Sequence, residues 1–178
     1  LGIINLYIEI GSFQNIFFFY NKSILSSSSY LWWCFFISFA IKIPVFPFHL
    51  WLPEAHVESP TEGSVVLAGI LLKLGTYGLC RFLFFLLPDK TYYYSSVVIT
   101  LCSLGIIYTS LMAVRQIDIK KIIAYSSVGH MNFCTIGLFS FNFYSLQGSI
   151  FMMVGHGVIS SALFFLIGIL YQRYHTKL

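Results

Sequence analysis

Apolar runs separated by short polar turns make up the chain from residue 30 to its end. The turns are rich in proline, charged residues, asparagine and serine, and the runs between them are long. A helix needs about 20 mostly apolar residues to cross the hydrocarbon core of a bilayer. The pattern therefore predicts an all-α, polytopic transmembrane bundle of about five membrane segments, at 30–52, 63–87, 95–114, 122–141 and 148–171.

The first segment differs from the others because prolines interrupt it. Pro44 and Pro47 follow an apolar run, Tyr30–Ile43, that is too short to span alone. Proline removes a helical hydrogen bond and clashes with the preceding turn, and such broken backbone at membrane depth must be buried in protein or line a wet cavity. We expect an interrupted helix here. Residues 1–29, which mix apolar and polar side chains, are expected to form a loop or interfacial segment before the bundle.

The composition supports a membrane protein and excludes several other classes. Of 178 residues, 58% are apolar and 9% are charged, and the mean hydropathy is +0.83. Soluble domains carry about 25% charged residues, so this chain cannot cover a soluble globule with charge. The net charge of +4 is spread thinly rather than gathered into a basic face, which excludes a nucleic-acid binder. Lipids are the expected surroundings.

Basic residues are distributed unequally between the two ends of the predicted bundle. If the first segment starts on side A, the turns on side B hold more basic residues than those on side A. Because cytoplasmic or matrix loops carry an excess of lysine and arginine, side B is the expected cytoplasmic or matrix side. The residues on side B are Arg115, Lys120, Lys121, Arg173 and Lys177, against Lys22 and Lys90 on side A.

The sequence contains no pattern that would hold a metal or a cofactor. H-E-x-x-H, glycine-rich nucleotide loops and C-x-x-C spacings are all absent from it. The cysteines lie inside apolar runs, which is typical of buried thiols that act as small hydrophobes. We therefore expect no catalytic, metal-binding or cofactor-binding residue in this chain. The cysteines are Cys34, Cys80, Cys102 and Cys134.

Two lysines and two histidines stand out inside the apolar segments, where charge is costly. Lys42 stands at the end of the short first run, Lys73 lies far from both ends of the second segment, and His130 and His156 lie in the fourth and fifth. A lysine at the centre of a bilayer costs about 2.5–3.5 kcal/mol. Snorkelling to the interface is an alternative for Lys42, whereas the stem of Lys73 is too short to reach either surface.

The chemistry that these side chains share is proton transfer. Burial disfavours the charged form of lysine, and imidazole titrates near neutrality, so amines and imidazoles joined by water can pass a proton between them. Ionisable groups at membrane depth usually mark such pathways. We interpret the four residues as a water-linked proton relay. The polar residues expected to support it are Ser126, Ser160 and Lys120.

Three runs of the sequence carry a family resemblance. Ala40–Glu58 includes the prolines of the break, Gly63–Gly78 holds the central lysine, and Gln116–Phe133 holds the first relay histidine. Together they resemble the NADH dehydrogenase (ubiquinone) subunit 4 family, the antiporter-like membrane subunits of respiratory complex I. By this resemblance the chain is the central part of an antiporter-like fold, about the middle third of the usual subunit.

The resemblance implies a function and a role for each relay residue. The chain would be a proton-translocating membrane-arm subunit of NADH:ubiquinone reductase, in the mitochondrial inner membrane, and would carry no redox site itself. Lys42 would pair with a glutamate and switch during the cycle, Lys73 would receive the proton, and His130 and His156 would carry it onward. FMN, iron–sulfur clusters and quinone would be bound by other subunits.

Parts of the family pattern have no counterpart in this sequence. The glutamate partner of Lys42 belongs to an earlier helix, so a neighbouring chain of the complex is expected to supply it together with the missing helices. One alternative is a membrane subunit of a cation/proton antiporter complex or of a membrane-bound hydrogenase, because these share the ancestry. A second is a structural membrane scaffold whose half-channel is inactive because the glutamate is absent.

Overall fold

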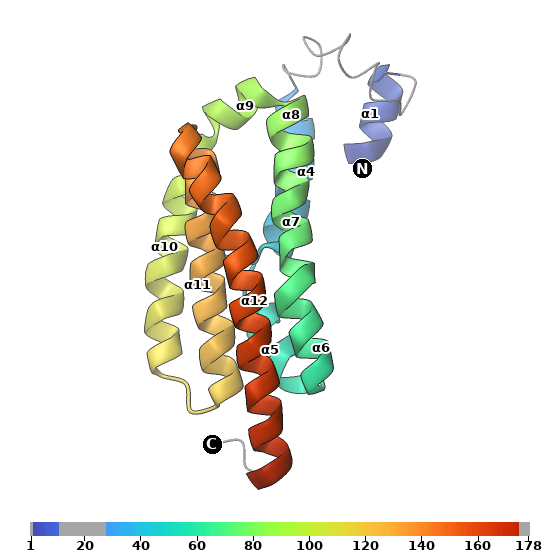
Figure 1. Ribbon diagram of the computed structural model, residues 1–178. Coiled ribbons are helices and arrows are strands. Elements are labelled where there is room, and N and C mark those ends of the chain that lie inside the picture. The colour runs from blue at the N-terminus through green and yellow to red at the C-terminus, as the bar shows by residue number, and fades with distance from the viewer. Residues whose placement is uncertain (1, 11–27, 175–178) are drawn as a thin grey trace.

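The computed structural model describes residues 2–10 and 28–174, whose main elements are helices (Figure 1). No strand occurs in these residues, and the predicted all-α class is confirmed. In chain order the elements are α1 (Gly2–Ile10), α4 (Ser29–Lys42), α5 (Trp51–Glu58), α6 (Thr61–Val66), the π-helical turn η1 (Leu67–Leu71), α7 (Leu72–Gly78), the π-helical turn η2 (Leu79–Leu83), α8 (Phe84–Leu86), α9 (Pro88–Tyr93), α10 (Ser95–Val114), α11 (Ile119–Phe139) and α12 (Phe143–Tyr174).

Several of these helices are long and apolar enough to cross a membrane. Elements α6 to α8 run as one continuous helix, which we call the Thr61–Leu86 helix. α4 is a shorter apolar helix. By length and composition the chain is a multi-pass membrane protein. Among the described residues the four candidate spans are Thr61–Leu86, Ser95–Val114, Ile119–Phe139 and Phe143–Arg173.

Helix α12 begins earlier than the sequence pattern predicts. Asn142, Ser145 and Gln147 predict a turn between the fourth and fifth segments, yet the helix starts at Phe143. Asn142 caps it: its Oδ1 accepts from the backbone N–H of Tyr144 at 3.3 Å, and its carbonyl accepts from the N–H of Leu146 at 3.0 Å. Asparagine is among the preferred residues at this position. The polar residues therefore form the first turn of the helix rather than a separate connection.

The interruption expected at Pro44 and Pro47 is present between α4 and α5, with turns in place of helix. The indole N–H of Trp51 donates to the carbonyl of Ile41 at 3.0 Å, which ties the start of α5 to the end of α4. The predicted segment ends at residue 52, whereas α5 continues to Glu58. Pro53 does not stop it, because a proline in the first turn removes no intrahelical hydrogen bond.

The first residues of the chain form a helix where the structure describes them. In α1 Leu6 is buried, and a Cβ placed on Gly2 would lie 3.3 Å from atoms of both Cys34 and Phe35. The apolar face of α1 therefore packs on α4. The rest of the loop or interfacial segment predicted for 1–29, residues 11–27, lies outside the described residues.

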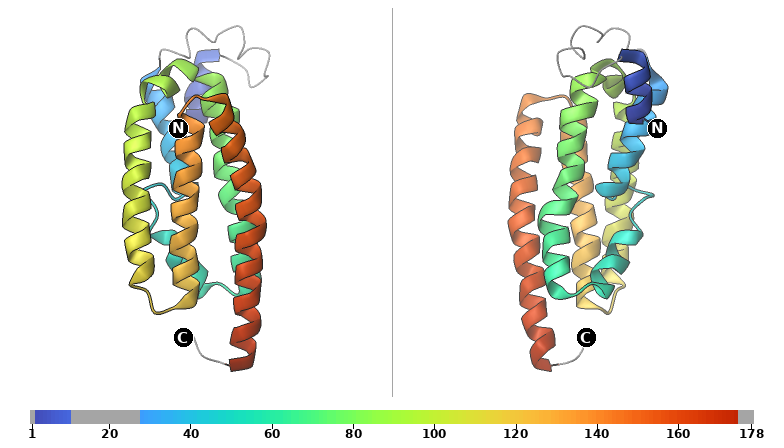
Figure 2. Two further views of the ribbon diagram at one scale, coloured as in Figure 1. Left: turned by 60° about the vertical axis from the view of Figure 1, so that its left-hand side comes forward. Right: turned by 90° about the vertical axis from the view of Figure 1, so that its right-hand side faces the viewer.

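The Thr61–Leu86 helix packs between α4 on one side and α12 on the other (Figures 1 and 2). Glycines permit both contacts. A Cβ on Gly78 would overlap the ring of Phe39 in α4, and a Cβ on Gly157 of α12 would stand 3.2 Å from the carbonyl of Gly69. Small residues of this kind let helix backbones approach closely in membranes. They bring the middle of the Thr61–Leu86 helix against α12.

Candidate functional site

Lys73 lies in a helix whose hydrogen-bond pattern widens on both sides of it. In η1 the N–H of Leu72 reaches back five residues, to the carbonyl of Leu67, and η2 follows one helical segment later. π-helical turns are rare and are frequent at functional sites. Because a wide turn displaces carbonyls from their usual partners, a lysine side chain from the same helix can reach one of them.

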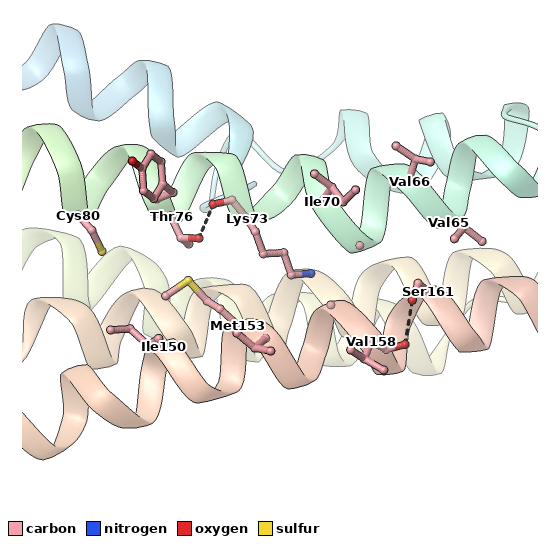
Figure 3. Close-up of a pocket in the computed structure, with 14 residues that line it drawn as sticks. Val65, Val66, Ile70, Lys73, Thr76, Cys80, Ile150, Met153, Val158 and Ser161 are labelled. Carbon is pink, nitrogen blue, oxygen red and sulfur yellow. Dashed lines mark hydrogen bonds between the residues drawn. The ribbon is translucent and has the colours of Figure 1, made fainter.

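The amine of Lys73 is held by a carbonyl and by an imidazole. Its Nζ donates to the carbonyl of Ala68, a residue of η1, at 2.6 Å. The same Nζ lies 2.9 Å from Nδ1 of His156 in α12, and Figure 3 shows the side chain extending toward that helix. The neighbouring Gly157 makes room, since a Cβ there would stand 3.4 Å from Cε of Lys73. The amine therefore has two partners inside the bundle.

His130 of α11 lies next to His156. The two ring centroids are 5.8 Å apart and the ring planes meet at 60°. A pocket of about 330 Å³ is lined by both rings together with Gly155 and its apolar neighbours. The three predicted relay residues Lys73, His156 and His130 therefore follow one another from the Thr61–Leu86 helix to α12 and then to α11.

A larger groove, of about 740 Å³, runs between the Thr61–Leu86 helix and α12 beside Lys73. Its walls are largely apolar, with Ile70, Met153 and Val158 among them (Figure 3). Lys73 is the charged residue in this lining, and Thr76 Oγ1 donates to its backbone carbonyl at 2.9 Å. The amine thus borders a space large enough to hold several water molecules.

Lys42 is not brought together with the other three residues. It is the last residue of α4, and its side chain is exposed. A Cβ on Gly75 would lie 3.1 Å from Cβ of Lys42, so the lysine stands beside α7. Gly75 and Lys73 are two positions apart, which places them on different faces of that helix. A relay role for Lys42 stays a prediction.

Of the three polar residues expected to support the relay, one lies beside it. Ser160 is buried and donates to the carbonyl of His156 at 2.6 Å. Ser126 is exposed and donates to a carbonyl of its own helix at 2.8 Å. Lys120 is buried elsewhere, and its Nζ donates to the carbonyl of Ser59 at 3.2 Å.

Three residues whose buried polar side-chain atoms lack hydrogen-bond partners in the described part of the chain were not among the predicted site residues. His49 and His56 are 2% and 0% exposed, and none of their ring nitrogens has a hydrogen-bond partner among the described residues. The Oδ1 of buried Asn132 also lacks one in that part of the chain. The signal that could have revealed the histidines is their close spacing in the short stretch that follows the break.

The described residues do not bring together a metal site. Histidine, cysteine, aspartate and glutamate side chains form no group of three or more that could hold an ion in residues 2–10 and 28–174. The four cysteines are free thiols.

The chain is similar to curated subunits of NADH–quinone oxidoreductases. NADH-ubiquinone oxidoreductase chain 4 of Acanthamoeba castellanii is 51% identical over 184 residues, which cover 100% of this chain and 36% of that protein. NADH-quinone oxidoreductase subunit M of Rickettsia bellii is 54% identical over 179 residues, which cover 99% of this chain and 36% of that protein. The chain thus spans about a third of the length of these relatives.

Structural comparison agrees with the sequence. A chain in the solved structure of respiratory complex I from Thermus thermophilus with bound NADH has a TM-score of 0.82 at 26% identity, covering 99% of this chain and 38% of that chain. The predicted all-α, antiporter-like transmembrane bundle is confirmed. A family model described as "NADH:quinone oxidoreductase/Mrp antiporter, TM" matches residues 1–178. The chain belongs to the NADH:quinone oxidoreductase/Mrp antiporter transmembrane family.

Proposed function

We propose that this chain is a proton-conducting part of the membrane arm of respiratory complex I. The observation that carries the proposal is the 2.9 Å separation between Nζ of Lys73 and Nδ1 of His156, inside apolar helices. An amine at membrane depth costs about 2.5–3.5 kcal/mol and generally marks an ion or proton pathway. A purely structural contact would not need two titratable groups in this setting.

The geometry supports a proton transfer in defined steps. An N–H bond of the Lys73 ammonium breaks as Nδ1 of His156 takes the proton, which leaves a neutral amine and an imidazolium. The imidazolium then releases its proton from Nε2 toward His130, whose ring centroid lies 5.8 Å away, through water. The Ala68 carbonyl holds the amine in place throughout. Imidazole suits the middle position because it accepts on one nitrogen and donates from the other.

The relatives support complex I as the host assembly. Proteins more than half identical to this chain are NADH–quinone oxidoreductase subunits, which favours this complex over a cation/proton antiporter complex or a membrane-bound hydrogenase. We propose the mitochondrial inner membrane as its location, other membrane-arm subunits as its partners, and FMN, iron–sulfur and quinone sites on other chains. An acidic side chain from outside the described residues would then face the exposed Lys42.

The proposal is tested by replacing Lys73 with methionine in the assembled complex. Lys73→Met keeps the length of the side chain and removes its proton-carrying nitrogen. Proton translocation by the complex in vesicles is expected to fall by about tenfold or more, the usual contribution of a positioned acid or base being at least that large. The matched control is Lys90→Met, in α9 at one end of the bundle, where Nζ lies 5.9 Å from the Tyr93 ring centroid.

Both outcomes are informative when assembly is checked by the subunit content of the purified complex. Loss of translocation in Lys73→Met, with normal translocation in Lys90→Met, supports the relay. Unchanged translocation in an assembled Lys73→Met complex would reject it and favour the scaffold reading. Copurification with subunits that bear flavin and iron–sulfur clusters would separate complex I from an antiporter complex.

A further inference from the structure

Exposed aromatic rings gather at the end of the bundle opposite Lys120. Among the described residues the three most exposed tyrosines, Tyr92, Tyr93 and Tyr144, are 69%, 72% and 79% exposed, and all three lie at this end. Figure 1 shows that α8 meets α9 there, that α10 and α12 begin there and that α11 ends there. We call this surface the aromatic rim. Its members are Tyr92, Tyr93, Phe141, Phe143 and Tyr144.

Helix α9 is held in place by a buried hydroxyl on its inner side. Thr91 is fully buried, and its Oγ1 accepts from the indole N–H of Trp32, a fully buried residue of α4, at 3.1 Å. The same hydroxyl donates to the carbonyl of Leu87 at 2.7 Å. Figure 1 shows α9 running across the ends of the long helices rather than along them. The inner side of α9 is thus tied to α4, and Tyr92 and Tyr93 are left on its outer side.

Phe141 joins the two halves of the rim from a strained backbone conformation. It follows the C-cap of α11 and has a φ of 53°, in the left-handed region that bulky residues rarely adopt and that glycine usually occupies after a helix. Its ring centroid lies 5.3 Å from that of Tyr92 and 5.7 Å from that of Phe84. Strained residues persist where their surroundings fix them. Here the fixed contacts connect the α11–α12 turn with α9 and α8.

The kind of aromatic residue changes along α12. Tyr144 and Tyr171 lie toward its two ends, whereas the exposed aromatic rings between them belong to Phe151 and Phe165. A tyrosine has an apolar ring and a hydroxyl that needs a polar partner, and tyrosines are enriched where the hydrocarbon of a membrane meets its headgroups. A phenylalanine has no polar atom and suits the hydrocarbon itself. The tyrosines of the rim therefore fit the headgroup layer.

The charge of the rim favours a lipid without net charge. In the connections at 87–94 and 140–147 the charged residues are Asp89 and Lys90, which offset each other. Anionic lipids are attracted by clusters of lysine and arginine, and these connections contain no such cluster. A zwitterionic phospholipid carries one phosphate and one amine, so its headgroup matches a surface of tyrosine hydroxyls whose charges cancel.

We propose that the aromatic rim binds the headgroups of zwitterionic phospholipids on the less basic side of the membrane and so fixes the depth of the bundle in the bilayer. The inference goes beyond proton conduction and does not depend on it. At 1.5 Å per residue, Lys73 lies about 20 Å along its helix from Leu86, where the rim begins. With the rim in the headgroup layer, the amine lies inside the hydrocarbon core, which is about 30 Å thick.

The proposal is tested by photolabelling the assembled complex in vesicles of phosphatidylcholine. One probe is phosphatidylcholine with a diazirine in its headgroup, and the other carries the diazirine at the end of an acyl chain. Mass spectrometry then gives the ratio of headgroup labelling to acyl-end labelling for each peptide. This ratio is expected to be several-fold higher at Tyr92–Tyr93 and at Phe143–Tyr144 than at Leu104, an exposed residue near the middle of α10.

A pair of substitutions tests the role of the tyrosine hydroxyls. Replacing both Tyr92→Phe and Tyr93→Phe keeps the rings and removes the groups that bind headgroups. The labelling ratio of the α9 peptide is expected to fall toward the value at Leu104, while that at Phe143–Tyr144 stays high. The matched control is Tyr77→Phe, an exposed tyrosine in the middle of the Thr61–Leu86 helix, which is expected to leave the ratio at the rim unchanged.

Each result decides for or against the rim. Preferential labelling by the headgroup probe supports it, and loss of that preference in the double variant assigns it to the two hydroxyls. Preferential labelling by the acyl-end probe would place the rim in hydrocarbon and overturn the proposal. Labelling by neither probe, with chemical cross-links from this end to another subunit, would show that protein covers the rim and would also overturn it. Proton translocation by Lys73→Met bears on the relay alone.

Discussion

Lys42 of α4 and Lys73 of the Thr61–Leu86 helix are two relay candidates that the protein holds in opposite ways. Lys42 ends a short helix at a break in the backbone, and its side chain is exposed. Lys73 lies in the middle of a continuous helix and meets a carbonyl and an imidazole at 2.6 and 2.9 Å. The Lys42 side chain is exposed, whereas the Lys73 amine lies within hydrogen-bond distance of two partners inside the bundle.

The difference shows which proton-transfer contacts a single chain can complete. A cation in the last turn of a helix is stabilised by the helix dipole by about 0.3–1 kcal/mol, and Lys42 occupies that position in α4. Lys73 lies in the middle of a helix, where a carbonyl of η1 and a histidine contact its amine instead. We infer that Lys73 acts through this chain's own residues and Lys42 through elements outside the described ones.

The largest expected effect comes from exchanging each lysine for arginine. Arginine is planar, longer and always protonated. Lys73→Arg therefore cannot release a proton to His156, and proton translocation by the assembled complex is expected to fall by about a hundredfold. Lys42→Arg keeps a positive charge at an open helix end and is expected to retain most translocation. Equal losses in the two variants would contradict the contrast between an enclosed and an open amine.

An intermediate effect is expected from two glycines of α12. A Cβ on Gly157 would stand 3.2 Å from the carbonyl of Gly69, whereas one on Gly148 would meet no described atom within 4 Å. Gly157→Val therefore pushes α12 away from Lys73, and translocation is expected to fall by about tenfold, as expected when proton donor and acceptor separate. Gly148→Val is the control. Similar translocation in both variants would show that close helix contact at Lys73 is not required.

The smallest effect is expected from the two serines predicted to support the relay. Ser160 donates to the carbonyl of His156, and Ser126 donates to its own helix at an exposed position. Ser160→Ala is expected to slow translocation by about twofold to threefold, since one neutral hydrogen bond is worth about 0.5–1.5 kcal/mol. Ser126→Ala is expected to have no effect. A larger loss in Ser126→Ala than in Ser160→Ala would reverse the assignment.

Much of the fold was predictable because each part of it follows from local chemistry. Apolar runs of sufficient length predict membrane helices, and Pro44 and Pro47 predict the break. The boundaries were less predictable where one side chain decided them. Asn142 caps the start of α12. Because asparagine is also common in turns, the sequence alone does not distinguish a cap at this position from a turn.

The site was predictable in its residues but not in its contacts. Lys73, His130 and His156 were singled out because ionisable groups are costly in apolar segments, and the structure brings these three together. The direction of Lys73 depends on η1, whose wide turn has no sequence signature. His56 escaped attention because its burial comes from α12, through the ring of Phe164 more than a hundred residues later in the chain.

Because of the π-helical turns, the directions of the side chains in the Thr61–Leu86 helix depend on the exact number of residues in it. Each residue turns an α-helix by about 100°, and a π turn accommodates one residue more than an α turn. If one residue between Leu67 and Leu71 were deleted, η1 would become an ordinary α-helical turn. The amine of Lys73 would then point toward a different neighbour. Deletion of a single residue in η1 is therefore expected to be tolerated less often than substitution of a residue in η1, whichever amino acid is introduced.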